Sequence, residues 1–195
     1  NFLKCQHDFG RIGIPVPLVR RAVLEQSNYT EAMRSVLTAP RSFSTNLMLR
    51  HEEGEAIDLE ATPPEVFWVR AENGLLVHAN HFASVGAQAK MNDLGLHVTP
   101  DSLHREERVR AMLSARIGSI DIPDLKVAFA DRRGAPHAVC RSPVLGPGGG
   151  TSSTVATIIM DVTHRRALIA VAPYRGAEFW QYDLTGDQPK PETVQ

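Results

Sequence analysis

The fold prediction depends on the stretch Ser42-Phe43-Ser44-Thr45-Asn46-Leu47-Met48-Leu49, where the spacing of the apolar residues changes. Upstream, apolar residues recur every three or four positions over residues 17–25 and 30–37, which predicts two helices, the second capped by Thr30. Within the stretch, every second residue is apolar or β-branched, which is typical of a strand. Pro40 separates the two patterns, so helices give way to sheet at this point.

Three further strands are predicted directly after the first. They cover residues 55–61, 66–70 and 75–80, and each is preceded by a turn signal. The turn before the last strand is Asn73-Gly74, which strongly favours a two-residue hairpin. Consecutive strands joined by short turns predict an antiparallel sheet.

The second half of the chain repeats the order of helices and then strands. Helical spacing covers residues 102–114 and 121–130, and strand patterns cover residues 155–162, 167–171 and 178–182. A polar tail follows at residues 185–195. Helices and strands that are segregated in this way predict an α+β layered fold.

The composition excludes several functional classes. The chain has 195 residues, 43% hydrophobic and 22% charged, with a net charge of −1, so it lacks the basic excess of a nucleic-acid-binding protein. No apolar run approaches the roughly 20 residues that span a bilayer, so no membrane association is expected. Cys5 and Cys140 fit two reduced thiols in a cytoplasmic protein. No cysteine or histidine cluster has metal-ligand spacing, and no metal site is predicted.

The densest polar cluster is His78-Ala79-Asn80-His81, directly after an apolar strand pattern. Side chains at the end of a strand are held rigidly, and an asparagine there could donate to an oxyanion. A histidine there could act as a general base. The alternative is structural, with the histidine satisfying a buried main-chain group.

Other polar clusters have equally plain alternatives. Ser44, Thr45 and Asn46 interrupt a strand, which could also be an edge strand with a solvated face. Ser152 and Ser153 lie in the glycine-rich stretch 148–154, which lacks the lysine of a phosphate-binding loop and could be a flexible hairpin connection. Cys5 is followed by His7 and Asp8, but residues so close on an extended chain point past one another, so catalysis by Cys5 is not expected.

The order of these motifs resembles a known enzyme family. The chain is similar to the β-subunit of the isopenicillin-N acyltransferase (acyl-coenzyme A:6-aminopenicillanic acid acyltransferase) family of autoproteolytic N-terminal-nucleophile hydrolases. The most specific match is Asn73-Gly74-Leu75-Leu76-Val77-His78-Ala79-Asn80-His81. Weaker matches in the same order are Gly13-Ile14-Pro15, residues 20–25, Glu31-Ala32, Ser44, residues 46–49, Leu59-Glu60, Asp101-Ser102, Arg105, Arg108, residues 139–141, 154–161 and 179–183.

The resemblance implies an αββα sandwich, of which residues 1–184 would form the C-terminal part. In this family the precursor cuts itself before a cysteine, which becomes the nucleophile and uses its own α-amino group as base. That cysteine would lie upstream of Asn1, so the partner would be an N-terminal segment or α-subunit of the same precursor, and this chain alone would be inactive. Asn80 matches the family's oxyanion donor, and Ser44 a serine that lines the site.

The implied substrate is a small-molecule amide or thioester, with acyl-coenzyme A as an acyl donor and no tightly bound cofactor. We expect His78, His81, Ser152 and Ser153 to contact substrate. The family's acyltransferase member has a Ser-Arg pair in the loop before the strand at Val155. This chain has Gly150-Thr151-Ser152-Ser153 there, without arginine, which argues against penicillin-type substrates. Two hypotheses remain: an amide hydrolase or acyltransferase, and a catalytically inactive remnant of the same fold that binds a small ligand.

Overall fold

The computed structural model describes residues 2–146, 149–186 and 191–194. The chain divides into two compact units, Asn1–Leu103 and His104–Gln195, which are described one at a time. Residues 147 and 148 of the predicted glycine-rich loop lie outside the described residues.

Two helices open the first unit: α1 spans Val16–Leu24 and α2 spans Tyr29–Thr38. These bounds confirm both predicted helices to within a residue or two. The side chain of Asn28, not Thr30, caps α2 by accepting the N–H of Glu31 over 3.0 Å. Asn28 has the extended main chain that a capping residue needs, whereas Thr30 is already inside the first turn.

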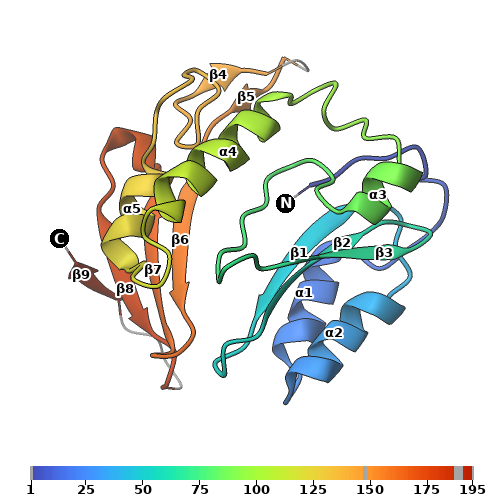
Figure 1. Cartoon of the computed structure of the whole chain (residues 1–195), viewed down its shortest axis with the longest axis horizontal. Helices are drawn as coiled ribbons and strands as arrows, with labels where there is room; N and C mark the ends of the chain where they lie inside the picture. The colour runs from blue at the N-terminus through green and yellow to red at the C-terminus, as the bar shows by residue number, and fades with distance from the viewer. Residues whose placement is uncertain (1, 147–148, 187–190, 195) are drawn as a thin grey trace. The chain divides into compact units, whose positions relative to one another are not determined.

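A three-stranded antiparallel sheet follows, in the order β1 (Thr45–Arg50), β2 (Ala56–Ala61) and β3 (Val66–Arg70). Helices α1 and α2 lie on one face of this sheet (Figure 1). The core between them consists of Val19, Val36, Leu47, Leu49, Leu59 and Ala61. Burying one leucine or valine side chain is worth about 1.5–3 kcal/mol, so this apolar face fixes the register of the strands.

The predicted fourth strand, residues 75–80, is wrong. The Asn73-Gly74 turn forms, and Glu72 and Leu75 exchange both main-chain hydrogen bonds at 3.0 Å, but the pairing stops at that single bridge. Further along, the N–H of Asn80 donates to the Ser102 hydroxyl instead of to a strand. The segment leaves the sheet because its polar groups find other partners.

A short helix, α3 (Val85–Lys90), lies in a region that the sequence pattern left irregular. Ser84 caps it by accepting the N–H of Ala87 over 3.2 Å. Six residues are too few for a clear helical period, which explains why the pattern did not reveal it. The next helix, α4 (Asp101–Ser114), confirms the prediction for residues 102–114 and runs across the boundary between the two units.

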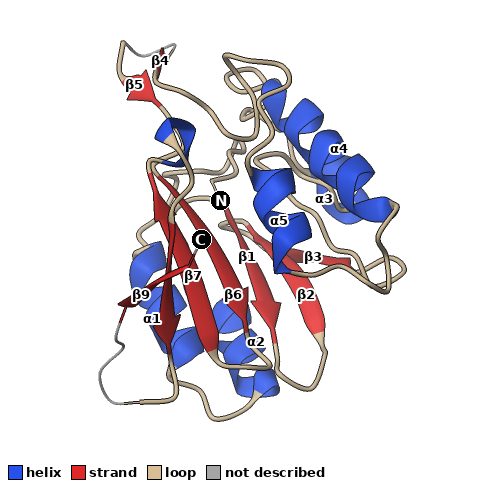
Figure 2. Cartoon of the chain, turned by 90° about the vertical axis from the view of Figure 1, so that its left-hand side faces the viewer, coloured by secondary structure: helices blue, strands red, loops and turns tan. Residues whose placement is uncertain are grey.

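The second unit contains a four-stranded antiparallel sheet in the order β6-β7-β8-β9. Its strands are β6 (Ala156–Asp161), β7 (Arg166–Val171), β8 (Phe179–Asp183) and β9 (Pro191–Val194), of which β9 comes from the polar tail. Helix α5 (Ile122–Phe129) packs Ile122 and Leu125 against buried apolar residues of this sheet (Figure 2). Minor elements are the strands β4 (Val144–Leu145) and β5 (Thr151–Ser152) and the 3-10 helix η1 (Pro173–Arg175).

The mixture of helices and antiparallel sheets confirms the predicted α+β class. Each unit packs helices against a sheet, which is the pair of layers that occurs twice in an αββα sandwich. None of the helices described here is long and apolar enough to cross a membrane.

Candidate functional site

The face of the first sheet opposite α1 and α2 is polar and buried. Asn46 on β1 pairs with Glu60 on β2, and Asp58 lies two residues before Glu60 on the same face. All three side chains belong to buried residues, with relative exposures of 5%, 0% and 0% for Asn46, Asp58 and Glu60. Buried acidic groups need compensating partners, and these partners come from residues 78–84.

His78 supplies the main partner. Its Nε2 lies 2.8 Å from Oε1 of Glu60, and its Nδ1 lies 2.9 Å from Nδ2 of Asn46 and 3.6 Å from Oδ2 of Asp58. The side chains of His78, Glu60 and Asp58 are completely enclosed. Because both ring nitrogens face protein groups and none of the ring is exposed, the structure favours an internal role for His78 over contact with a substrate.

The charges in this network are unequal. Burial acts against ionisation of Glu60, but hydrogen bonds from His78, Ser84 and Ala83 outweigh it and lower the pKa of Glu60. Burial likewise acts against the charged form of His78, but Glu60 and Asp58 raise its pKa. Burial raises the pKa of Asp58, and Oδ1 of this residue has no hydrogen-bond partner among the described residues. The network is therefore an ion pair of Glu60 with His78, beside a carboxyl group that resists ionisation.

Glu60 also binds the far end of the same loop. Its Oε1 accepts the N–H of Ala83 over 2.5 Å, and its Oε2 accepts the hydroxyl of Ser84 over 2.5 Å. Asp93 adds a further contact, because its Oδ2 accepts the N–H of Phe82 over 2.8 Å. The loop that carries Asn80 is thus attached at several points to the buried carboxylate of Glu60 and the partly buried one of Asp93.

Asn80 lies within this loop and is partly exposed. Its side-chain nitrogen donates to the carbonyl oxygen of Phe2 over 3.1 Å, and its main-chain N–H donates to Oγ of Ser102 over 2.6 Å. Phe2 forms a β-bridge with Thr45, the first residue of β1. The amide of Asn80 therefore lies beside the N-terminal segment where that segment meets the sheet.

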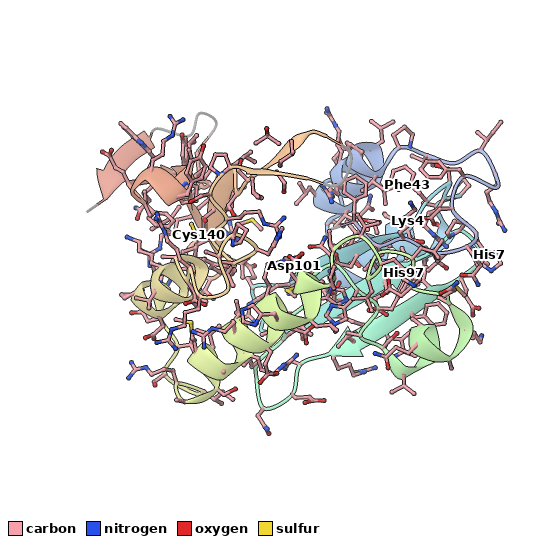
Figure 3. All side chains as sticks on the ribbon, turned by 90° about the horizontal axis from the view of Figure 1, so that it is seen from above. Lys4, His7, Phe43, His97, Asp101 and Cys140 are labelled. Atoms are coloured by element: carbon pink, nitrogen blue, oxygen red, sulfur yellow. The ribbon has the colours of Figure 1, made fainter. Side chains whose placement is uncertain are left out.

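Ser44, directly before β1, meets the same segment. Its side chain is fully buried, and its Oγ donates to Oδ1 of Asp8 over 2.7 Å and lies 3.3 Å from Sγ of Cys5. The rings of Phe2 and Phe9 each stack on Phe43, so this segment runs beside residues 42–45 (Figure 3). Ser44 and Asn80 thus contact the same segment, although their side chains have different partners in it.

Cys5 is poorly suited to be a nucleophile. Its side chain is buried in an apolar cluster with Leu3, Phe82 and Met91. Burial raises the pKa of the Cys5 thiol, and Asp8 raises it further, so the thiolate is disfavoured. The geometry agrees with the expectation that Cys5 is not catalytic. Ser44, Thr45 and Asn46 are buried. The strand β1 does lie at an edge of its sheet, but the alternative of a solvated face at these three residues is excluded.

The remaining predicted residues lie in other surroundings. His81 is 6% exposed, and its Nδ1 lies 2.8 Å from Oγ of Ser102, so it contacts the same hydroxyl as Asn80. Ser152 lies in the second unit, on β5, where its Oγ accepts a hydrogen bond from Nη1 of Arg141 over 3.0 Å. Ser153 is partly buried beside it. This loop is therefore hydrogen-bonded to an arginine from another segment of the second unit.

Four residues of the network were given no role from the sequence: Asp58, Glu60, Ser84 and Ser102, although Glu60 and Ser102 lie in stretches that match the family. On an alternating strand, Asp58 and Glu60 look like a solvated face opposite Leu59. One sequence feature could have indicated that they are buried: two acidic residues lie on a short strand without a basic residue among their neighbours in sequence. Ser84 and Ser102 stand at helix starts, where serine is expected for capping alone.

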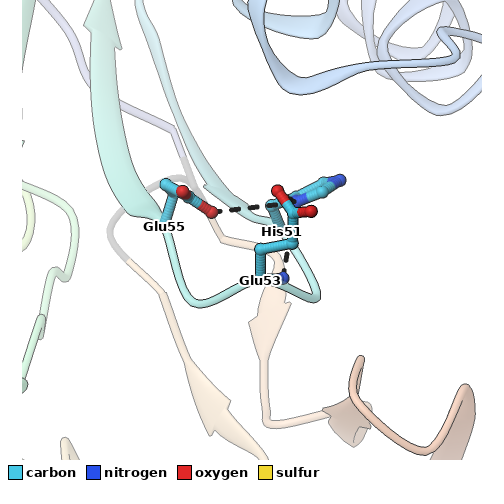
Figure 4. Close-up of side chains that lie close together, drawn as sticks. All are labelled: His51, Glu53 and Glu55. Atoms are coloured by element: carbon cyan, nitrogen blue, oxygen red, sulfur yellow. Dashed lines mark hydrogen bonds and ion pairs between the residues drawn. The ribbon is translucent and has the colours of Figure 1, made fainter.

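A separate group of ionisable residues lies on the hairpin between β1 and β2 (Figure 4). Nδ1 of His51 lies 3.6 Å from Oε2 of Glu53 and 3.7 Å from Oε2 of Glu55, and the side chains of Glu53 and Glu55 are 75% and 54% exposed. Among the described residues, these three have metal-ligating atoms within 4.8 Å of one another. A protonated His51 would pair with both carboxylates, so the geometry does not require an ion.

Comparisons with known proteins give one family and one notable structure. The model of the family described as "Acyl-coenzyme A:6-aminopenicillanic acid acyl-transferase" matches residues 1–175. A search of curated proteins found no match. Among solved structures, a variant of conjugated bile acid hydrolase from Clostridium perfringens is similar, with 15% identity and a TM-score of 0.47. The match covers 76% of this chain and 54% of that one, so this chain spans about half the length of the hydrolase.

Proposed function

We propose an activity from one premise: the chain belongs to the acyl-coenzyme A:6-aminopenicillanic acid acyl-transferase family. We infer that it is the C-terminal part of a cysteine amide hydrolase or acyltransferase of the N-terminal-nucleophile type. The observation that carries this proposal is the family match, which spans residues 1–175 and so includes both Ser44 and Asn80. The nucleophile would be a cysteine outside residues 1–195, freed by self-cleavage of a precursor.

The proposed reaction has two steps. The cysteine sulfur attacks the carbonyl carbon of a small amide or thioester, while the thiol proton moves to the α-amino group of the same cysteine. The carbonyl oxygen becomes an oxyanion, and the C–N or C–S bond then breaks as the leaving group takes that proton. The acyl group is then joined to the cysteine sulfur as an acyl-enzyme thioester. In the second step water or an amine attacks this thioester, which frees the cysteine thiol and releases an acid or a new amide.

Asn80 would stabilise the oxyanion. Preorganised donors that face a developing negative charge are often the largest electrostatic contribution to such reactions. Support comes from the position of the amide of Asn80, which is partly exposed on a loop that buried groups hold at several points. In the complete enzyme the amide would exchange its bond to Phe2 for one to the substrate oxygen. Ser44 would line the site through its contacts with Cys5 and Asp8.

Mass spectrometry of the protein expressed from its complete gene tests this proposal. We expect a chain that contains residues 1–195 and starts at a cysteine upstream of Asn1, and N-terminal sequencing identifies that residue. After a short exposure to p-nitrophenyl acetate and acid quenching, that cysteine should carry one acetyl group. A protein that binds small amides but never becomes acetylated would support the alternative of an inactive ligand-binding remnant.

A further inference from the structure

The carboxylate of Glu60 is bound to the Asn80 loop on both sides of Asn80. Two residues before Asn80, Nε2 of His78 lies 2.8 Å from Oε1 of Glu60. After Asn80, the N–H of Ala83 donates to Oε1 over 2.5 Å, and the hydroxyl of Ser84 donates to Oε2 over 2.5 Å. The loop between these attachment points contains only residues 79–82, so its conformation depends on where Glu60 holds its ends.

Glu60 is itself a rigid anchor. It lies on β2, the central strand of the sheet, where it pairs with Asn46 on one side and Phe67 on the other. Its side chain is completely enclosed. Functional groups are held most precisely when ordered strands and buried hydrogen bonds support them. Glu60 therefore holds the loop in a fixed position relative to the sheet.

We propose that Glu60 is a positioning residue for Asn80, because its carboxylate fixes both ends of the loop and thereby the direction of the Asn80 amide. This inference rests on the proposed role of Asn80 as an oxyanion donor. Glu60 itself is enclosed and contacts neither substrate nor nucleophile. Its effect on the reaction passes through the position of Asn80.

The charge and shape of the carboxylate both matter. Four donors converge on it: Nε2 of His78, the N–H groups of Ala83 and Ser84, and the hydroxyl of Ser84. A carboxylate accepts at both oxygens, whereas the amide of a glutamine accepts at one and donates at the other. In Glu60→Gln, the amide NH2 would therefore face a hydrogen-bond donor of the loop at one end, while the volume of the side chain stays nearly the same.

The experiment measures acylation in the protein expressed from its complete gene. Stopped-flow release of p-nitrophenolate from p-nitrophenyl acetate gives the first-turnover rate constant and the concentration at half-saturation. The variants are Glu60→Gln, Asn80→Ala and the two combined, with Glu65→Gln as the matched control. The side chain of Glu65 bonds to Lys90 at the surface and is 38% exposed, so the same chemical change occurs there outside the network.

We expect Glu60→Gln to lower the acylation rate constant about 10- to 100-fold, because a small misplacement of a catalytic group has an effect of this size. The concentration at half-saturation should change little, because the oxyanion exists only in the transition state. In the Asn80→Ala background, Glu60→Gln should cause no further loss, since its target is gone. The Glu65→Gln control should match the wild type.

Two results overturn the inference alone: an unchanged rate constant in Glu60→Gln, or losses that multiply in the double variant although Asn80→Ala is itself slow. If Asn80→Ala acylates at the wild-type rate, both this inference and the proposed role of Asn80 fail. If Glu60→Gln does not fold, Ser84→Ala replaces it, because it removes one donor to Oε2 and leaves the charge in place. A loss of a few-fold that vanishes in the Asn80→Ala background supports the inference, and a wild-type rate in Ser84→Ala overturns it.

Discussion

Oε1 of Glu60 lies 2.8 Å from Nε2 of His78, and both side chains are fully enclosed. This pair joins the central strand of the first sheet to the loop that carries Asn80. Interactions between ionised groups in a buried site depend on pH, because folding changes the pKa of each partner. The structure therefore predicts how the stability of the full-length protein varies with pH.

The Glu60–His78 pair should stabilise the protein most in mildly acidic solution. The pKa of Glu60 is lowered, so its contribution is present above its ordinary pKa and is lost as the pH falls through the lowered value. The pKa of His78 is raised, so its contribution is present below its ordinary pKa and is lost as the pH rises through the raised value. Both contributions are complete between about pH 4.3 and 6.5.

His78→Gln tests this window, because glutamine keeps a donor toward Glu60 but loses the charge. It should lower the free energy of unfolding by about 2 kcal/mol inside the window. The difference from the wild type should shrink at alkaline pH, where His78 is neutral in both folded and unfolded states. Urea unfolding at several pH values measures this, and a difference that is as large at alkaline pH as inside the window would contradict the prediction.

Asp58→Asn should show the opposite dependence. Burial raises the pKa of Asp58, so the wild type loses stability as the pH rises from the ordinary pKa of the carboxyl to the raised one. The asparagine cannot ionise and escapes that loss. The melting temperature of the variant relative to the wild type should therefore increase as the pH is raised from about 3 to 7. A relative melting temperature that falls over this range would show that the carboxylate of Asp58 is stabilising.

Arg41 should be important for stability. It is 8% exposed, and its guanidinium donates to the carbonyl oxygens of Val36, Ala39 and Thr62 at 2.7–2.8 Å, which joins the end of α2 to the end of β2. Arg41→Ala leaves these acceptors without their charged donor and should cost about 3 kcal/mol. The control is Arg34→Ala. The ion pair of Arg34 with Glu31 is exposed, and such a surface pair should contribute less than about 1 kcal/mol. Equal losses in the two variants would contradict the structural role of Arg41.

Cys5 should be dispensable for the reaction. Cys5→Ala removes a buried sulfur and should cost about 1 kcal/mol in stability, while p-nitrophenyl acetate should still acetylate the full-length protein. Intact mass after acid quenching gives the extent of acetylation in the variant and the wild type. A complete loss of acetylation in a folded Cys5→Ala variant would make Cys5 the nucleophile and would overturn the proposed upstream cysteine.

The fold of the first unit could largely be predicted from local patterns. The helical repeats near Val19 and Val36 and the alternation of Leu47 and Leu49 follow from the need to bury one face of each element. The end of the sheet could not be predicted. Asn73-Gly74 indicates a turn. Whether a strand continues beyond it depends on whether the following main-chain groups hydrogen-bond to a neighbouring strand or to side chains.

The candidate site was predictable only in part. Asn80 and Ser44 came from their place in the sequence and from the family resemblance. The functions of Glu60 and Ser102 depend on contacts with residues about 20 positions away, such as the N–H of Asn80 on Ser102 and the N–H of Ala83 on Glu60. No local pattern contains such information. The enclosure of His78 also depends on such distant contacts. The sequence alone does not show it, and His78 was therefore expected to contact substrate.

The most direct test of the account is the acylation rate of Asn80→Ala in the protein expressed from its complete gene. Removal of one oxyanion donor should slow p-nitrophenolate release in the first turnover about 100- to 1000-fold, which corresponds to roughly 3–4 kcal/mol. The melting temperature should stay close to that of the wild type, because the hydrogen bond from the Asn80 side chain to the carbonyl oxygen of Phe2 is exposed. A folded Asn80→Ala variant that acylates at the wild-type rate would contradict the central claim that Asn80 stabilises the oxyanion.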